Sequence, residues 1–222
     1  MDPSDFWEEQ EQVERFAARD PDRRLLELIE RFDNPGRTRV LDIGCAGGRN
    51  TELLALRGFD VYAIDASRAM TERTRERVAA VLGPEDAALR VRTGRMEDLS
   101  RFESEGFDLV VALGVFHSAT SREQWETALS ESARVLAVGG ILLVATFSPL
   151  TDPHGNGIAE VPGEPHLYDG LHSGLHYLVD ADGLDAGMAR NGLEPIEETN
   201  TVVVQLEEGR RVTVNGLYKK TE

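Results

Sequence analysis

The amino-acid sequence predicts an α/β fold, a three-layer sandwich around a seven-stranded, mostly parallel sheet that ends in an antiparallel C-terminal hairpin. Short apolar runs alternate with amphipathic helical patterns between Val40 and Phe147, which is the order typical of parallel sheets. The run 40–43 passes at once into small residues and then into a helical pattern, as a strand, a tight turn and a helix would. Near the end of the chain, strands are predicted at 195–206 and 210–218, joined through a short turn.

The other elements follow from the same periodicities and from the turn residues between them. Earlier strands are expected at 40–43, 59–64, 89–93, 107–113 and 141–147. Helices are expected within 4–33, as one or two segments, and then from 51 to the C-cap Gly58, at 67–82, at 121–136 and at 180–191. Ser67 and Ser121 are placed to cap two of these helices, and Gly83-Pro84 is expected to end the first of the two.

The chain divides into an N-terminal helical segment, 1–36, and one larger domain, 37–222, because the sequence Asn-Pro-Gly at 34–36 interrupts helices. In the first segment, Trp7 and the aromatic residues near it are expected to pack against the sheet as core, with a lid over a ligand as the alternative. In the larger domain, residues 148–177 break the α/β alternation with many prolines, glycines and histidines. We predict a long cap loop there, because loops of this length usually serve a function.

Composition limits the class of partner. Asp and Glu number 40 against 24 Lys and Arg, and the net charge of −16 disfavours nucleic acid. No apolar run reaches membrane-spanning length, and the charged N-terminus is not typical of a signal peptide. These features predict a cytoplasmic protein that is a monomer or a homodimer and acts on a small molecule. Two interpretations of the acidity stay open: an acidic protein from a GC-rich genome, or adaptation to high salt.

The small residues after the first strand predict a nucleotide-binding turn. Between Gly44 and Gly48 the backbone can approach a ligand closely, and the next helix presents its N-terminus there. A dinucleotide fingerprint would need G-x-G-x-x-G, but Ala46 and Arg49 occupy the second and third glycine positions. Asp65 ends the second strand, where a ribose-binding carboxylate belongs, although it could alternatively cap the following helix.

The sequence VLDIGCAGG at 40–48 resembles the D-x-G-x-G-x-G signature of the class I S-adenosylmethionine-dependent methyltransferases, with Ala46 in place of the middle glycine. The segment GRMEDL at 94–99 resembles the G-D-x-x-x-L loop of that family, with Arg95 where aspartate is usual. ESARVLAVGGILLVATF also resembles its helix, Gly-Gly turn and fifth strand. The resemblance therefore runs from about Val40 to Phe147.

This resemblance implies that the chain binds S-adenosylmethionine and transfers its methyl group to a small-molecule acceptor by direct displacement. The cofactor-binding residues that it implies are Asp42, Gly44, Cys45, Ala46, Gly48, Asp65, Ala66, Met96, Leu113 and Gly114. Met96 would lie against the adenine ring, with a plain core role as the alternative. Leu113 and Gly114 would lie beside the sulfonium. The alternatives are a non-catalytic protein that binds the cofactor, an NAD-dependent oxidoreductase, which the missing glycines disfavour, and an enzyme of other alkyl chemistry.

Two groups of residues are candidates for the methyl acceptor. His117 follows the predicted strand 107–113 and is a candidate general base, with a structural histidine as the alternative. In the cap, His154, His166 and Tyr168 are candidate substrate-binding residues. His172 and His176 have the spacing of a two-histidine metal site, but Gly174 and the lack of cysteine there disfavour one, and no metal is predicted. Cys45, the single cysteine, is expected to be a small buried residue rather than a nucleophile.

Overall fold

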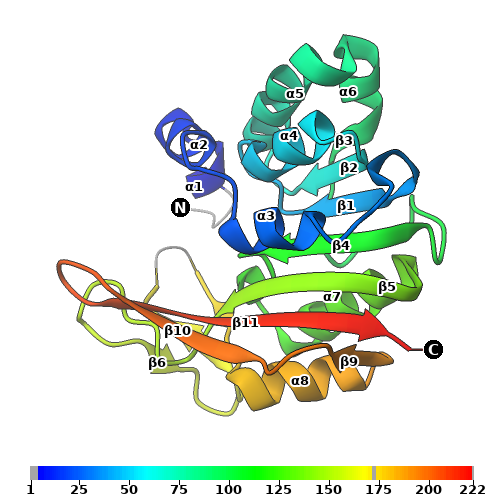
Figure 1. The fold of residues 1–222 in the computed structure, drawn as a ribbon. Helices are drawn as coiled ribbons and strands as arrows, with labels where there is room; N and C mark the ends of the chain where they lie inside the picture. The colour runs from blue at the N-terminus through cyan, green and yellow to red at the C-terminus, as the bar shows by residue number, and fades with distance from the viewer. Residues whose placement is uncertain (1–4, 172–173, 222) are drawn as a thin grey trace.

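A computed structural model gives the structure of residues 5–171 and 174–221. Within these residues the main sheet has eight strands, seven of them in the order β10-β11-β5-β4-β1-β2-β3, with β9 paired to β11 (Figure 1). Its strands are β1 (Arg39–Ile43), β2 (Asp60–Asp65), β3 (Val91–Thr93), β4 (Phe107–Leu113), β5 (Leu136–Phe147), β9 (Leu193–Pro195), β10 (Asn200–Gln205) and β11 (Arg210–Lys220). The five neighbouring strands β3, β2, β1, β4 and β5 are parallel to one another, whereas β11 runs antiparallel to β5, β9 and β10. The predicted sheet and its terminal hairpin are confirmed, and β9 is an addition.

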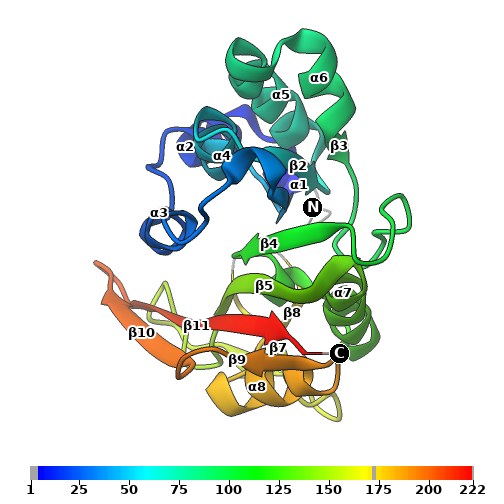
Figure 2. The same cartoon turned by 45° about the vertical axis from the view of Figure 1, so that its right-hand side comes forward.

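Helices cover both faces of the sheet (Figures 1 and 2). They are α1 (Asp5–Glu8), α2 (Gln10–Ala17), α3 (Arg23–Ile29), α4 (Arg49–Leu56), α5 (Arg68–Leu82), α6 (Pro84–Arg90), α7 (Arg122–Val135) and α8 (Ala181–Ala189), with short 3-10 turns η1 (Pro35–Arg37) and η2 (Phe116–Ser118). Buried side chains of α3 and α4 pack on one face of β1 and β4, and those of α7 and α8 pack on the other. None of the described helices combines the length and the apolarity that crossing a membrane requires.

The capping serines and the end of α5 behave as expected, whereas the segments after them differ from the prediction. The side chains of Ser67 and Ser121 accept hydrogen bonds from the backbone N–H groups of α5 and α7. Helix α5 ends at Leu82 with Gly83 as its C-cap, as predicted, but Pro84 then starts a further helix, α6, because proline suits the first turn of a helix. The predicted third strand therefore loses its first residues to α6. The turn predicted at Gly139-Gly140, after α7, is also absent as such. These two glycines lie inside β5, at the place where the pairing of β5 with β4 shifts register.

The N-terminal segment packs differently from the prediction. It forms three helices, and α1 and α2 lie on α5 rather than on the sheet. The rings of Phe6, Trp7 and Phe16 contact one another edge to face, with Trp7 at centroid distances of 4.9 Å and 5.1 Å from the two phenylalanines. The prediction that Trp7 packs against the sheet is therefore wrong, because α3 and α4 already cover that face.

The segment 148–177 is more ordered than a loop in its described part. It carries a second sheet of β6 (Ala159–Glu160), β7 (Leu167–Asp169) and β8 (His176–Tyr177) in that order. The Tyr177 ring packs 5.0 Å from the Trp125 ring of α7, and Asp152 bridges to Arg210 at the start of β11. The segment 148–177 is therefore attached to α7 through its small sheet and to the terminal hairpin through Asp152.

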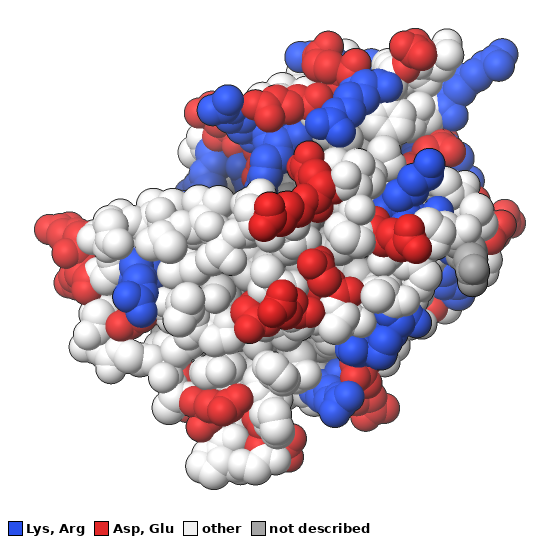
Figure 3. Space-filling model, turned by 60° about the horizontal axis from the view of Figure 1, so that its bottom comes forward, with Lys and Arg blue, Asp and Glu red and all other residues white. Residues whose placement is uncertain are grey.

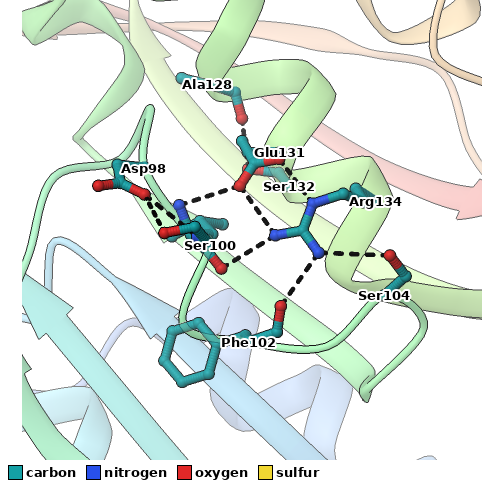
Figure 4. Close-up of polar contacts among 9 residues, drawn as sticks. Asp98, Ser100, Phe102, Ser104, Ala128, Glu131, Ser132 and Arg134 are labelled. Atoms are coloured by element: carbon teal, nitrogen blue, oxygen red, sulfur yellow. Dashed lines mark hydrogen bonds and ion pairs between the residues drawn. The ribbon is translucent and has the colours of Figure 1, made fainter.

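One arginine fastens the loop between β3 and β4 to α7 (Figure 4). Arg134 donates to the carbonyl oxygens of Leu99 and Phe102, at 2.9 Å and 3.0 Å, and pairs with Glu131 at 2.6 Å. Glu131 in turn accepts a hydrogen bond from the Leu99 N–H at 3.0 Å. Since the same loop carries Met96, this network holds one edge of the predicted cofactor site.

Replacement of Arg134 tests that network. Arg134→Met removes a charged donor from two carbonyl oxygens and leaves Glu131 without its counterion, so it should lower the free energy of unfolding by about 1–3 kcal/mol. Arg122→Met on the same helix breaks only an exposed pair with Glu126 and should cost less than about 0.5 kcal/mol. Urea titration measures both variants. Equal losses would show that the loop does not depend on Arg134.

Candidate cofactor and acceptor site

The turn after β1 is wound through three left-handed residues. Gly44, Ala46 and Gly48 have φ angles of 73°, 49° and 81°, and Ala46 is the non-glycine among them. The N–H groups of Gly44 and Cys45 both donate to the carbonyl oxygen of Ile64, at 2.9 Å and 3.0 Å. The turn is thereby tied to the end of β2. The D-x-G-x-G-x-G pattern thus marks backbone conformations that side chains disfavour, and Ala46 adopts one of them at a steric cost.

Small residues are required in this turn because neighbours approach it from two sides. A Cβ atom on Gly44 would lie 2.9 Å from Cβ of Val115, which follows β4. A Cβ atom on Gly47 would lie 2.5 Å from Cβ of Ala17 at the end of α2. The turn is therefore enclosed by the end of β4 and by the N-terminal helices.

Asp65 lies at the end of β2, directly beside the turn. Its Oδ2 accepts from the Ala46 N–H and its Oδ1 from the Ser67 N–H, both at 2.9 Å. Burial raises the pKa of Asp65 to about 6, so the carboxyl group is ionised above neutral pH. The side chain is only half-buried and the next residue, Ala66, is exposed, so a ligand can reach it. Each carboxylate oxygen keeps a second lone pair for a hydroxyl group.

Asp42 is a buried carboxylate beneath the turn. It is 2% exposed, and its Oδ2 accepts from the Thr51 hydroxyl of α4 at 2.7 Å. Burial raises the pKa of Asp42 to about 6, and the nearby Asp65 adds to this rise. Cys45 is also buried, and burial raises the pKa of its thiol, which is the opposite of what a nucleophile needs.

The remaining predicted cofactor residues lie at the ends of the next strands. Met96 is 7% exposed and belongs to the core cluster, packed among residues such as Ile64 and Leu99. Leu113 ends β4 half-buried. Gly114 follows with a φ angle of 86°, and its N–H donates to Ala145 of β5 at 2.8 Å. The roles of these residues toward the cofactor stay predictions.

His117 lies on η2, beyond the end of β4, and is almost fully buried. Its ring stacks on Phe147 at the end of β5, with centroids 4.1 Å apart. The Nδ1 atom of His176 lies 3.2 Å from the His117 carbonyl oxygen, and since a carbonyl only accepts, this nitrogen carries the proton. The N–H of Tyr177 donates to Ala119 at 2.9 Å. The loop with His117 is therefore fastened to strand β8 of the cap.

The structure brings one of the three predicted substrate-binding residues, Tyr168, near this place. Tyr168 pairs with His176 in the small sheet, and cross-strand partners share a face, so Tyr168 lies on the side that faces His117. His166 is exposed, with its ring 5.7 Å from that of Tyr177. His154 lies apart, exposed and 4.0 Å from Glu208 in the hairpin turn. A substrate role for His154 therefore has no support in the geometry.

Among the described residues, no three His, Cys, Asp or Glu side chains are grouped so that they could hold a metal ion. His172, which the sequence pairs with His176, lies outside those residues.

The N-terminal helices reach the site, which the sequence offered only as an alternative. The Glu8 carboxylate accepts from the N–H groups of Arg68 and Ala69, at 2.8 Å and 3.1 Å, at the start of α5. The Ser67 hydroxyl donates to the Trp7 carbonyl oxygen at 2.9 Å. Helix α1 therefore lies beside Asp65, close to the lid arrangement that was the alternative. No local pattern marks Glu8, Val115 or Phe147 as site residues, because each reaches the site through tertiary packing.

Residues 41–144 match the family model described as a methyltransferase domain. The chain is 32% identical over 129 residues to a ubiquinone biosynthesis O-methyltransferase of Caulobacter sp. (strain K31). The alignment covers 55% of this chain and 48% of that protein. It is 30% identical over 163 residues to a protein of the same name from Brucella anthropi. That alignment covers 72% of this chain and 61% of the Brucella protein. Residues 41–144 therefore match a methyltransferase domain, the family that the sequence motifs resemble.

The chain spans about half the length of the first of these relatives. Its fold is also that of 1,6-didemethyltoxoflavin-N1-methyltransferase from Burkholderia thailandensis, whose structure holds bound 1,6-didemethyltoxoflavin and S-adenosylhomocysteine. The two superpose with a TM-score of 0.62 at 19% identity, over 98% of this chain and 82% of the other. The strand order is therefore the one that the resemblance implied.

The raised pKa of Asp42 gives a test of the site that needs no bound ligand. An aspartate whose pKa rises from 3.8 to about 6 on folding favours the folded state at low pH, and this contribution is lost as pH rises through 6. Asp42→Asn removes the buried charge and keeps an acceptor for Thr51. At pH 8 it should raise the free energy of unfolding by about 2–3 kcal/mol, and the gain should shrink between pH 6 and pH 4.

Urea titrations across that pH range measure the effect, with Asp86→Asn on the exposed face of α6 as the matched control. A difference between Asp42→Asn and the wild type that did not vary with pH would contradict the assignment of the buried charge.

Proposed function

We propose that this methyltransferase transfers a methyl group from S-adenosylmethionine to a hydroxyl oxygen of a small, planar acceptor by direct displacement. The observation that carries the proposal is the order of three neighbouring strands. Strands β2, β1 and β4 lie side by side, and their carboxyl ends present Asp65, the turn 44–48 and His117 along one edge of the sheet. Ligands of open α/β sheets bind at this edge.

The residues at this edge fit the cofactor of the family. The half-buried Asp65 offers two acceptor oxygens for the ribose hydroxyls, and the compact turn leaves room for the backbone to approach the ligand. Leu113 and Gly114 supply an apolar, unhindered end to β4 beside the acceptor half of the site. S-adenosylmethionine, when bound, supplies a methyl group made electrophilic by its sulfonium.

The acceptor half favours a small ring that carries a hydroxyl group. Phe147 is half-buried with its ring stacked on His117, and Tyr168 lies on the facing side of the cap. Offset stacking on such rings suits a planar acceptor. The two curated relatives are named as O-methyltransferases, which supports oxygen as the atom methylated. The net charge of −16 disfavours nucleic acid.

His117 is assigned to the acceptor proton. In the displacement the acceptor oxygen would bond to the methyl carbon as the bond from that carbon to the cofactor sulfur breaks and S-adenosylhomocysteine leaves, while the imidazole of His117 would take the proton from the acceptor O–H. The His176 contact to the His117 backbone holds the loop in place for this step. Alignment of the oxygen with the methyl group by Phe147 and the cap contributes separately.

Loss of the ribose-binding acid should weaken the cofactor. Asp65→Asn keeps the shape of the side chain but replaces one acceptor oxygen with a donor, so S-adenosylmethionine should bind more weakly by about 1–3 kcal/mol. Calorimetric titration of the folded variant measures this, with Asp86→Asn as the control. Unchanged affinity in folded Asp65→Asn would remove this carboxylate from the site.

Loss of the base should affect turnover and not cofactor binding. His117→Phe preserves the stack on Phe147 but cannot accept a proton, and it should lower turnover by about 10²–10⁴-fold. Its affinity for S-adenosylmethionine should stay within a few tenths of a kcal/mol. Formation of S-adenosylhomocysteine with a panel of catechols and other phenols measures turnover.

Full activity of His117→Phe would leave catalysis to alignment alone. A wild-type protein that binds S-adenosylmethionine but methylates no hydroxyl compound in the panel would contradict the proposed acceptor class and favour a non-catalytic binding protein.

A further inference from the structure

Strand β10, at the free edge of the main sheet, carries a concentration of exposed apolar side chains. Ten large hydrophobic side chains of the described residues are exposed, and five of them lie in the segment 196–206. They are Ile196, Val202, Val203, Val204 and Leu206, with exposed fractions from 37% to 53%. In Figure 3 an extended uncharged area lies on the side where the β10–β11 hairpin projects, with charged side chains near its tip. Contiguous apolar surface of this kind marks interaction sites.

The backbone of this strand is also unpaired on one side. The N–H of Leu206 donates to the carbonyl oxygen of Gly209 at 2.8 Å. With the register of the hairpin, this bond determines which residues of β10 form hydrogen bonds with β11. The N–H and C=O groups of even-numbered residues then point toward β11, and those of Thr201, Val203 and Gln205 point outward. Natural sheets blunt such an edge with Lys, Pro or bulges, and β10 has none of these.

We propose that β10 pairs antiparallel with β10 of a second copy of this chain, so that two main sheets become continuous across a two-fold axis at Val203. In this register Val203 lies opposite Val203 of the second copy, and Thr201 lies opposite Gln205 of the second copy. The outward groups of these residues then exchange hydrogen bonds, and the exposed valines pack against one another. An isologous contact of this kind closes as a dimer.

The distribution of charge favours a second copy as the occupant. Residues 199–206 contain no ionisable side chain, so two chains that each carry −16 can approach there with the least repulsion. Arg210 and Arg211 begin β11 beside the same edge, while Glu207 and Glu208 form the turn. The edge therefore has no single sign of charge that a basic or an acidic partner would recognise.

The same register predicts how the dimer depends on salt. It places Glu198 near Glu208 of the second copy at each end of the paired strands, and like charges directly opposite one another destabilise pairing. Salt screens this repulsion. Dimerisation should therefore strengthen between about 0.1 M and 1 M NaCl, whereas an interface held by opposite charges would weaken.

Sedimentation velocity over a range of protein and NaCl concentrations tests the proposal. The wild-type chain should dimerise, and Val203→Lys should weaken the dimer by about tenfold or more, because two ammonium groups would meet at the axis. Leu89→Lys, an equally apolar-to-basic change at a 60% exposed site on α6, should leave the dimer unchanged. A wild-type chain that stays monomeric, an association that weakens with salt, or equal effects of the two lysines would overturn the proposal.

Cysteine cross-linking separates this dimer from salt-induced aggregation, which would not depend on β10. Cys45 is buried, so Val203→Cys and Leu89→Cys each provide one exposed thiol. Hydrogen-bonded antiparallel partners have Cα atoms about 5.5 Å apart, within the range that a disulfide spans. Mild oxidation should yield a covalent dimer of Val203→Cys and little of Leu89→Cys. Equal cross-linking would contradict the two-fold pairing.

Discussion

Three hydrogen bonds from the turn after β1 to the end of β2 position the rest of the site. The carbonyl oxygen of Ile64 takes the first two N–H groups of the turn, and the carboxylate of Asp65 takes the N–H of Ala46. Asp65 thus stabilises a residue at a φ angle of 49°, where alanine is disfavoured, and still faces the mouth of the site with its remaining lone pairs. One carboxylate therefore connects the stability of the turn with recognition of the ligand.

This arrangement concentrates negative charge in a poorly hydrated place. Asp42 and Asp65 lie on adjacent strands, and the solvent-exposed Glu8 adds a third carboxylate nearby, at the start of α5. Burial raises the pKa of both aspartates to about 6. A ligand that donates hydroxyl groups and carries positive charge would relieve this arrangement, as S-adenosylmethionine does. The same helix α1 that brings Glu8 also accepts a hydrogen bond from Ser67, two residues after Asp65.

Sequence patterns predicted the parallel core because local rules are sufficient there. The apolar run of β4 is reproduced from Phe107 to Leu113, and Ser67 caps α5 as its position suggested. The patterns failed where local chemistry competed. Gly83-Pro84 does end α5, but proline also starts helices, and the unpredicted α6 replaces the beginning of the third strand.

The acceptor side was less predictable than the cofactor side. The turn and Asp65 follow from a compact motif and from the end of one strand. By contrast, the stack of His117 on Phe147 and the contact of His176 join residues that lie far apart in the chain. The small sheet of the cap has strands of two or three residues, too short for periodicity to reveal. His154 was grouped with the other cap residues by composition alone, and the fold separates it from them.

The account depends most on the claim that the edge formed by β2, β1 and β4 holds S-adenosylmethionine and not a dinucleotide. Parallel calorimetric titrations of the wild-type chain with S-adenosylhomocysteine and with NAD⁺ test this claim directly. The account predicts saturable one-to-one binding of S-adenosylhomocysteine and no heat of binding from NAD⁺, since the third glycine of the dinucleotide turn is replaced by Arg49. Saturable binding of NAD⁺ without binding of S-adenosylhomocysteine would contradict it.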